Sequence, residues 1–85
     1  METNPAYYQL SSKVQLEELN PHQIGIRKVI KSRIIQKDAL KIVDTARQIQ
    51  QVDTQLKVSL ICTRNICSKS IALLAKEGIG ICYVE

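Results

Sequence analysis

The sequence predicts an α/β fold: a small mixed four-stranded sheet in the order strand-strand-helix-strand-helix-strand, with both helices packed on it. Three observations carry this prediction. Apolar residues alternate with a period of two near the beginning, recur at helical spacing in the middle, and form strand, helix and strand in the last third. At 85 residues the chain fits one domain. We expect a flexible tail over residues 1–7 and a single α/β domain over residues 8–85.

The first part of the chain predicts a hairpin. From Tyr8 to Leu16, apolar and polar side chains alternate as in a half-buried strand. The segment Leu19–His22 contains Asn-Pro, which favours a turn. Alternation over residues 24–31 then predicts a second strand, antiparallel to the first.

The rest of the chain predicts a helix and then a strand-helix-strand unit. Lys57–Thr63 and Ile81–Val84 read as strands that flank a helix over Ser68–Lys76, with Gly78 and Gly80 ending that helix. Such a unit favours parallel strands, and because both strands are apolar on both faces we expect them to be central in the sheet. The earlier helix is predicted by apolar residues that share one face, namely Ala39, Ile42, Val43, Ala46 and Ile49.

Composition limits the cellular context and the partners. Hydrophobic residues make up 45% of the chain, which argues against disorder. No apolar run approaches the roughly 20 residues of a membrane helix, and the beginning lacks the features of a signal peptide. We therefore expect a cytoplasmic, intracellular protein with reduced cysteines. The net charge of +4 is compatible with an acidic partner such as nucleic acid.

The loop Cys62–Ser68 lies where α/β folds often place ligands, after a strand and before a helix. Its cysteine at the strand end, followed by Asn-Ile-Cys and then Ile71-Ala72, resembles the signature of low-molecular-weight protein tyrosine phosphatases. In that family an arginine closes the loop, whereas Ser68 stands at its position here. The alternative is that Cys62 is a buried strand residue and Cys67 a packing residue at the helix start.

A second resemblance covers more of the chain. The segment Ser68–Ile79, with Ser-Lys at its start and Leu-Ala-Lys before Gly-Ile, resembles the late segment of Mrr-type restriction-endonuclease-like folds. Lys31 and the stretch after it resemble the lysine that ends the catalytic strand in that family. The resemblance implies a nuclease-like fold with a degenerate site, because Val29 stands where a Mg²⁺-binding carboxylate is expected and only Glu17 or Glu18 lies near.

Cations cluster between the second strand and the first helix. They favour electrostatic contact with nucleic-acid phosphates, DNA or RNA, with little base specificity. Lys41 belongs to the same cluster, Lys13 can join it across the hairpin, and the alternative is a solvated face. The predicted nucleic-acid-binding residues are Arg27, Lys28, Lys31, Arg33, Lys37 and Arg64.

The sequence predicts no cofactor and no metal site. Cys62 and Cys67 are five positions apart and His22 stands alone, unlike the paired short spacings of zinc ligands. We therefore expect a binding domain and not an enzyme. The alternatives left open are a protein-interaction or self-assembly module (a dimer or a subunit of a larger complex), formed through the hairpin's edge strand, and a metal-dependent nuclease-like enzyme using Glu18 and Lys31.

Overall fold

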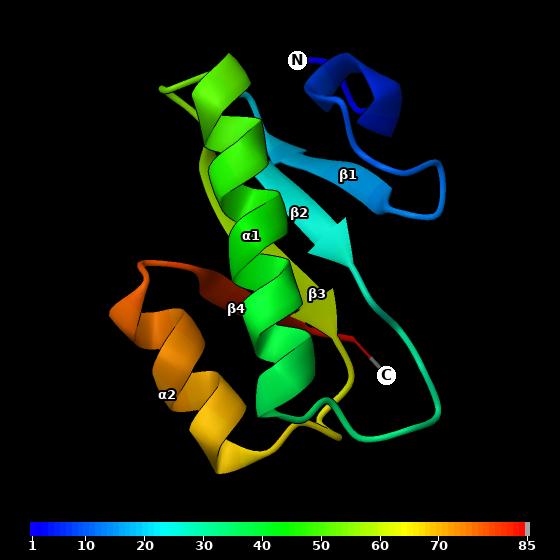
Figure 1. Ribbon diagram of the computed structural model, residues 1–85, viewed down its shortest axis with the longest axis vertical. Helices are drawn as coiled ribbons and strands as arrows, with labels where there is room; N and C mark the ends of the chain where they lie inside the picture. The colour runs from blue at the N-terminus through cyan, green and yellow to red at the C-terminus, as the bar shows by residue number, and fades with distance from the viewer. Residues whose placement is uncertain (85) are drawn as a thin grey trace.

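Four strands form one mixed sheet, and two helices lie side by side on a single face of it (Figure 1). The protein is represented by a computed structural model that describes residues 1–84. The predicted order of strands and helices is confirmed. The elements are a 3₁₀ helix η1 (Pro5–Tyr8), β1 (Gln15–Asn20), β2 (Gln23–Arg27), α1 (Gln36–Val52), β3 (Lys57–Cys62), α2 (Ser68–Lys76) and β4 (Gly80–Tyr83).

The strands lie in the order β1-β2-β3-β4 across the sheet. β1 is antiparallel to β2, and the pairs β2–β3 and β3–β4 are parallel. Each parallel step moves the chain one strand further in the same direction, which places both connecting helices on the same face. The expectation that the fourth strand is central was wrong: β4 is an edge strand and its residues are exposed or half-buried.

The hairpin is real, but its first strand begins later than predicted. Residues 8–14 do not pair with β2, because the chain turns at Ser11 instead. The Ser11 hydroxyl accepts a hydrogen bond from the Lys13 N–H, and the Ser11 carbonyl accepts one from the Val14 N–H. Such local bonds compete with a strand ladder. The second strand is also shorter than predicted and ends at Arg27.

The segment predicted as a tail contains the short helix η1, which packs against α1. Asn4 caps it by accepting a hydrogen bond from the Ala6 N–H at 3.0 Å. Tyr8 is buried in the core, and its hydroxyl donates to the Glu2 carbonyl at 2.6 Å. The last residue of the predicted domain, Glu85, lies outside the described residues.

The core is aliphatic and lies between the helices and the sheet. The predicted apolar face of α1 is buried at Ala39, Ile42, Ala46 and Ile49. It faces strand residues in matched register: Ile24 is opposite Val58, and Ile26 is opposite Leu60. Residues that are paired across a sheet point to the same side, so these side chains form one layer beneath α1.

Both helices have defined ends. The Asp38 carboxylate accepts a hydrogen bond from the Ile35 N–H at 3.1 Å, at the start of α1. The Cys67 sulfur accepts one from the Ser70 N–H at 3.4 Å, at the start of α2. α2 spans the residues that were predicted, and Gly78 follows it with a positive φ of 75°, a conformation that favours glycine. Neither helix in residues 1–84 is long and apolar enough to cross a bilayer.

Candidate anion-binding site

Two loops join at the carboxyl ends of the parallel strands. The Ile34 N–H donates to the Asn65 carbonyl at 2.9 Å, and the Cys67 N–H donates to the Ile34 carbonyl at 3.0 Å. These bonds form an isolated parallel bridge between Ile34 and Ile66. The Asn65 side chain also donates to the Lys31 carbonyl at 3.3 Å. The loop after β2 is therefore attached to the loop after β3.

Positive charge gathers around this end of the molecule. The loops after β2 and β3 lie here, as do the first turns of both helices and the turn before β1, which is antiparallel to β2. In residues 11–14, 28–41 and 63–71, Asp38 is the one acidic side chain. We call the cations in these segments the basic edge: Lys13, Lys28, Lys31, Arg33, Lys37, Lys41, Arg64 and Lys69.

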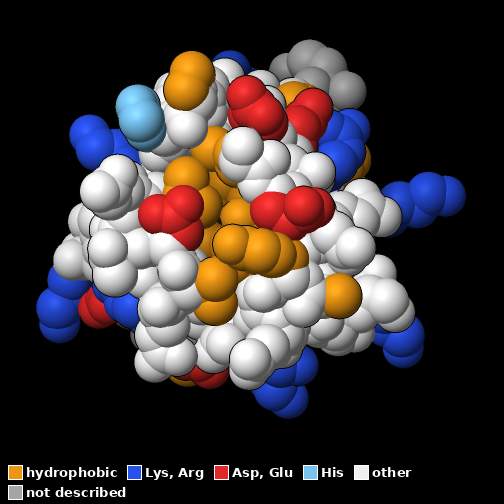
Figure 2. Space-filling model, turned by 90° about the horizontal axis from the view of Figure 1, so that it is seen from above, with side chains coloured by type: hydrophobic (Ala, Val, Ile, Leu, Met, Phe, Trp, Pro, Cys, Tyr) orange, Lys and Arg blue, Asp and Glu red, His pale blue; other side chains and the backbone are white. Residues whose placement is uncertain are grey.

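The opposite end of the molecule differs in character. Seen from the end where α1 finishes, hydrophobic side chains gather at the centre with acidic side chains on either side of them (Figure 2). Lysine and arginine side chains project mainly from the periphery in this view. The charges are therefore segregated between the two ends.

The structure brings most of the predicted cations together, but not all. Lys31, Arg33 and Lys37 are exposed on the basic edge. The Arg64 guanidinium carbon lies 4.9 Å from the centre of the Tyr83 ring, a cation–π geometry.

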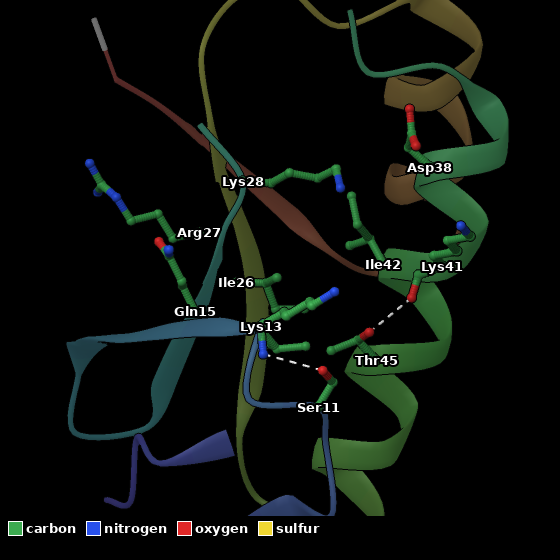
Figure 3. A pocket seen from close by; sticks show the side chains of 11 residues that line it. Ser11, Lys13, Gln15, Ile26, Arg27, Lys28, Asp38, Lys41, Ile42 and Thr45 are labelled. Carbon is green, nitrogen blue, oxygen red and sulfur yellow. Dashed lines mark hydrogen bonds between the residues drawn. The ribbon is translucent and has the colours of Figure 1, made fainter. Parts of the chain in front are cut away.

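Arg27 is the exception among the predicted residues. It lies at the mouth of a cleft, but its side chain is directed away from α1 (Figure 3) and forms an ion pair with Glu17 at 3.5 Å. Both side chains are well exposed, so this pair adds little to stability. Arg27 therefore belongs to the uncovered side of the sheet.

The cleft lies between α1 and the ends of the hairpin strands (Figure 3). Its volume is about 470 Å³, within the range of roughly 300–1,000 Å³ that is usual for small-ligand sites. Lys28 extends from the end of β2 toward α1, and Lys13 points across the same space (Figure 3). The lining residues are Ser11, Lys13, Val14, Gln15, Ile26, Arg27, Lys28, Asp38, Lys41, Ile42 and Thr45.

Several polar groups of the cleft are already hydrogen-bonded within the chain. The Thr45 hydroxyl donates to the Lys41 carbonyl at 3.0 Å, and Ser11 and Asp38 accept from backbone N–H groups as described above. Within residues 1–84, the ion pairs are Arg27–Glu17 and Arg47–Glu77. The three lysine ammonium groups of the cleft belong to neither pair.

The cysteines of the phosphatase-like loop have different environments. Cys62 is buried in β3, and burial together with the charge of Cys82 raises the pKa of its thiol. It therefore does not have the character of a nucleophilic thiolate. Cys67 is the cap of α2, where hydrogen bonds with the Ser70 hydroxyl and from the Ser70 N–H lower the pKa of its thiol, with a smaller contribution from the charge of Arg33.

The pair expected for nuclease chemistry is not assembled. Glu18 is opposite Ile24, near the amino end of β2, whereas Lys31 lies in the loop beyond the carboxyl end of that strand. Among residues 1–84, no three His, Cys, Asp or Glu side chains form a group suited to a metal ion.

No family model matches this chain, and neither does a curated protein or a solved structure. The site therefore has to be interpreted from its own geometry. Sequence reasoning did not identify the cleft. It placed Lys41 in the cation cluster and Lys13 as an addition across the hairpin, and it named neither among the binding residues. The antiparallel hairpin is the signal that could have found Lys13, because residues just before β1 must lie beside residues just after β2.

Proposed function

We propose that the chain is a non-catalytic binding domain that holds nucleic-acid phosphates at the basic edge. The observation that carries this proposal is the segregation of charge. Eight cations and one acidic residue occupy the segments at the carboxyl ends of β2 and β3, while acidic side chains flank the apolar centre of the opposite end (Figure 2). Such a surface attracts a phosphate backbone from one direction.

The proposed contacts are electrostatic and largely independent of base sequence. Exposed lysines and arginines release counterions when they neutralise phosphates, so affinity falls steeply with salt. The described aromatic residues are three tyrosines: Tyr8 is buried, Tyr7 is exposed in η1, and Tyr83 is exposed beside Arg64. Among the aromatic side chains of residues 1–84, only Tyr83 is next to a cation of the basic edge, which favours binding through the phosphate backbone over stacking on several bases.

Fluorescence anisotropy with a labelled DNA duplex and a labelled single strand, repeated over a salt series, tests the proposal. With six phosphate contacts, affinity for a duplex falls about 1,000-fold between about 50 mM and 200 mM salt. The test variant is Lys31→Gln with Arg33→Gln. It removes two exposed cations from the basic edge.

The control is Lys57→Gln with Lys76→Gln, which changes the net charge equally. Lys57 begins β3 and Lys76 ends α2, so both lie at the opposite end of the molecule. We expect the slope of log affinity against log salt to become shallower by about 1.8 for the basic-edge variant with a duplex, since each contact contributes about 0.9. Equal effects of the two variants, or an affinity that ignores salt, would refute the proposal.

A second candidate is self-assembly or docking of a protein partner, favoured by the open edges of the sheet. β1 and β4 are edge strands, and Gly80 and Tyr83 of β4 are exposed. Unpaired edges favour strand addition. Light scattering after size-exclusion chromatography tests this: a dimer that persists at high salt supports assembly, and a monomer at every concentration argues against it. The resemblance to restriction-endonuclease-like folds stays a prediction.

A further inference from the structure

Three lysines from separate parts of the chain line the cleft. Lys13 precedes β1, Lys28 follows β2, and Lys41 lies in the second turn of α1. The Lys28 backbone is fixed because its N–H donates to the Ile61 carbonyl at 2.8 Å. Lys28 extends toward α1 and Lys13 points across the same space, while the side chain of Lys41 lies along α1 (Figure 3).

The charge of the cleft is suited to a dianion. Three ammonium groups and the Asp38 carboxylate give +3 − 1 = +2, leaving aside Arg27, which is paired with Glu17. A phosphate monoester carries about −1.5 to −2 at neutral pH. A diester within a nucleic-acid backbone carries only one negative charge and would leave this site under-neutralised.

The floor of the cleft is apolar. Ile26 and Ile42 line it and are buried, and Val14 is half-buried beside them. Small-ligand sites combine such apolar walls with a few convergent polar groups. The volume of about 470 Å³ exceeds what a phosphate group alone needs. The cleft can therefore hold an organic group together with its phosphate.

We infer that the cleft binds a phosphate monoester of nucleotide size, with the phosphate among Lys13, Lys28 and Lys41 and the organic group over Ile26 and Ile42. The ligand is a free mononucleotide or the phosphorylated end of a nucleic-acid strand, since the two share this chemistry. The inference rests on the proposed function, because it takes its ligand class from the phosphates proposed to bind at the basic edge.

The test is a titration of the isotope-labelled full chain, followed by NMR of its backbone amides. The probes are AMP and adenosine, and a short DNA strand with either a 5′-phosphate or a 5′-hydroxyl. We expect AMP to shift the amides of Lys13, Lys28 and Thr45, which line the cleft. Adenosine should bind at least tenfold more weakly, because it lacks the charge-assisted hydrogen bonds to the lysines.

Variants test the roles of the charges. Lys28→Gln and Lys41→Gln should each weaken AMP binding roughly tenfold, the size expected for one lost charge-assisted hydrogen bond. Asp38→Asn should strengthen it, because it raises the charge of the cleft to +3. Lys57→Gln is the matched control at the opposite end of the molecule. Circular dichroism confirms that each variant is folded.

The outcomes separate this inference from the proposed function. Binding of AMP indicates a free nucleotide as the ligand, and preference for the 5′-phosphorylated strand without AMP binding indicates a strand end. The inference is wrong if AMP binds no more tightly than adenosine and the strand with a 5′-phosphate binds no more tightly than the strand with a 5′-hydroxyl. The proposed function would then still stand if the 5′-hydroxyl strand bound with salt dependence and shifted the amides around Arg33 and Asn65. Loss of strand binding with retention of AMP binding would refute the proposed function alone.

Discussion

Replacement of Ile34 by alanine should destabilise the protein, because this side chain holds the loop after β2 against the loop after β3. Ile34 is 1% exposed and pairs with Ile66, which is 6% exposed. The substitution removes three carbon atoms, worth about 0.8 kcal/mol each in transfer free energy, or about 2.4 kcal/mol in total. The cavity that remains adds to this, so we expect a loss of about 3 kcal/mol. A chain of this length has a total stability of about 4–13 kcal/mol.

The next residue provides a matched control. Ile35 is 49% exposed, so Ile35→Ala removes the same atoms from a side chain that is half in water. Its expected cost is below about 1 kcal/mol. Urea unfolding followed by circular dichroism compares the two variants, and the midpoint should fall with little change in slope. Equal losses for the two variants would show that Ile34 does not anchor the loop.

Three further outcomes are expected. Gly25→Ala should cost roughly 1–3 kcal/mol by overpacking, because a Cβ there would lie 2.9 Å from Cγ1 of Ile61; a neutral result in urea unfolding would contradict this close contact. Cys67 should be alkylated by iodoacetamide with a midpoint below the ordinary thiol pKa of about 8.5, because hydrogen bonds favour its thiolate, while the buried Cys62 reacts only on unfolding. Folding lowers the pKa of Cys67, so its thiolate stabilises the folded state fully above the unfolded pKa. This stabilisation is lost as the pH falls through the folded pKa. Peptide mass spectrometry over a pH series checks the reactivity, and equal rates for the two thiols would refute it. Glu77→Gln removes the ion pair between Arg47 of α1 and the residue that follows α2, at 2.7 Å, and keeps the backbone carbonyl that Arg47 also contacts; thermal unfolding should show a loss of about 0.2–1 kcal/mol, as for other exposed pairs, and a larger loss would contradict the weak contribution of this pair.

The elements with strong local signals were predictable. The start of α2 follows the apolar strand by a short loop, and its end is set by Gly78, whose positive φ a helix cannot continue through. The apolar spacing of α1 predicted its buried face because a helix brings positions three and four apart together. These signals depend on neighbours in the sequence and need no tertiary information.

Features that depend on distant parts of the chain were not predictable. The alternation from Tyr8 to Leu16 is interrupted by a turn, which local hydrogen bonds of Ser11 stabilise more than strand pairing would. The cleft exists only because the hairpin places Lys13 beside Lys28 and α1 adds Lys41. The charge pattern of the sequence identified the cations of the basic edge. It did not show that three of them, Lys13, Lys28 and Lys41, line one cleft.

The direction of the two helices also has a consequence for how fast a ligand arrives. α1 and α2 both begin at the basic edge, at Gln36 and Ser68. Each helix contributes about half a positive charge at its start and half a negative charge at its end. The two macrodipoles therefore add to the side-chain asymmetry and give the molecule one electrical axis. If the proposed function is right, such an axis turns an approaching polyanion toward the basic edge before contact, and low salt should raise the association rate more than it lowers the dissociation rate.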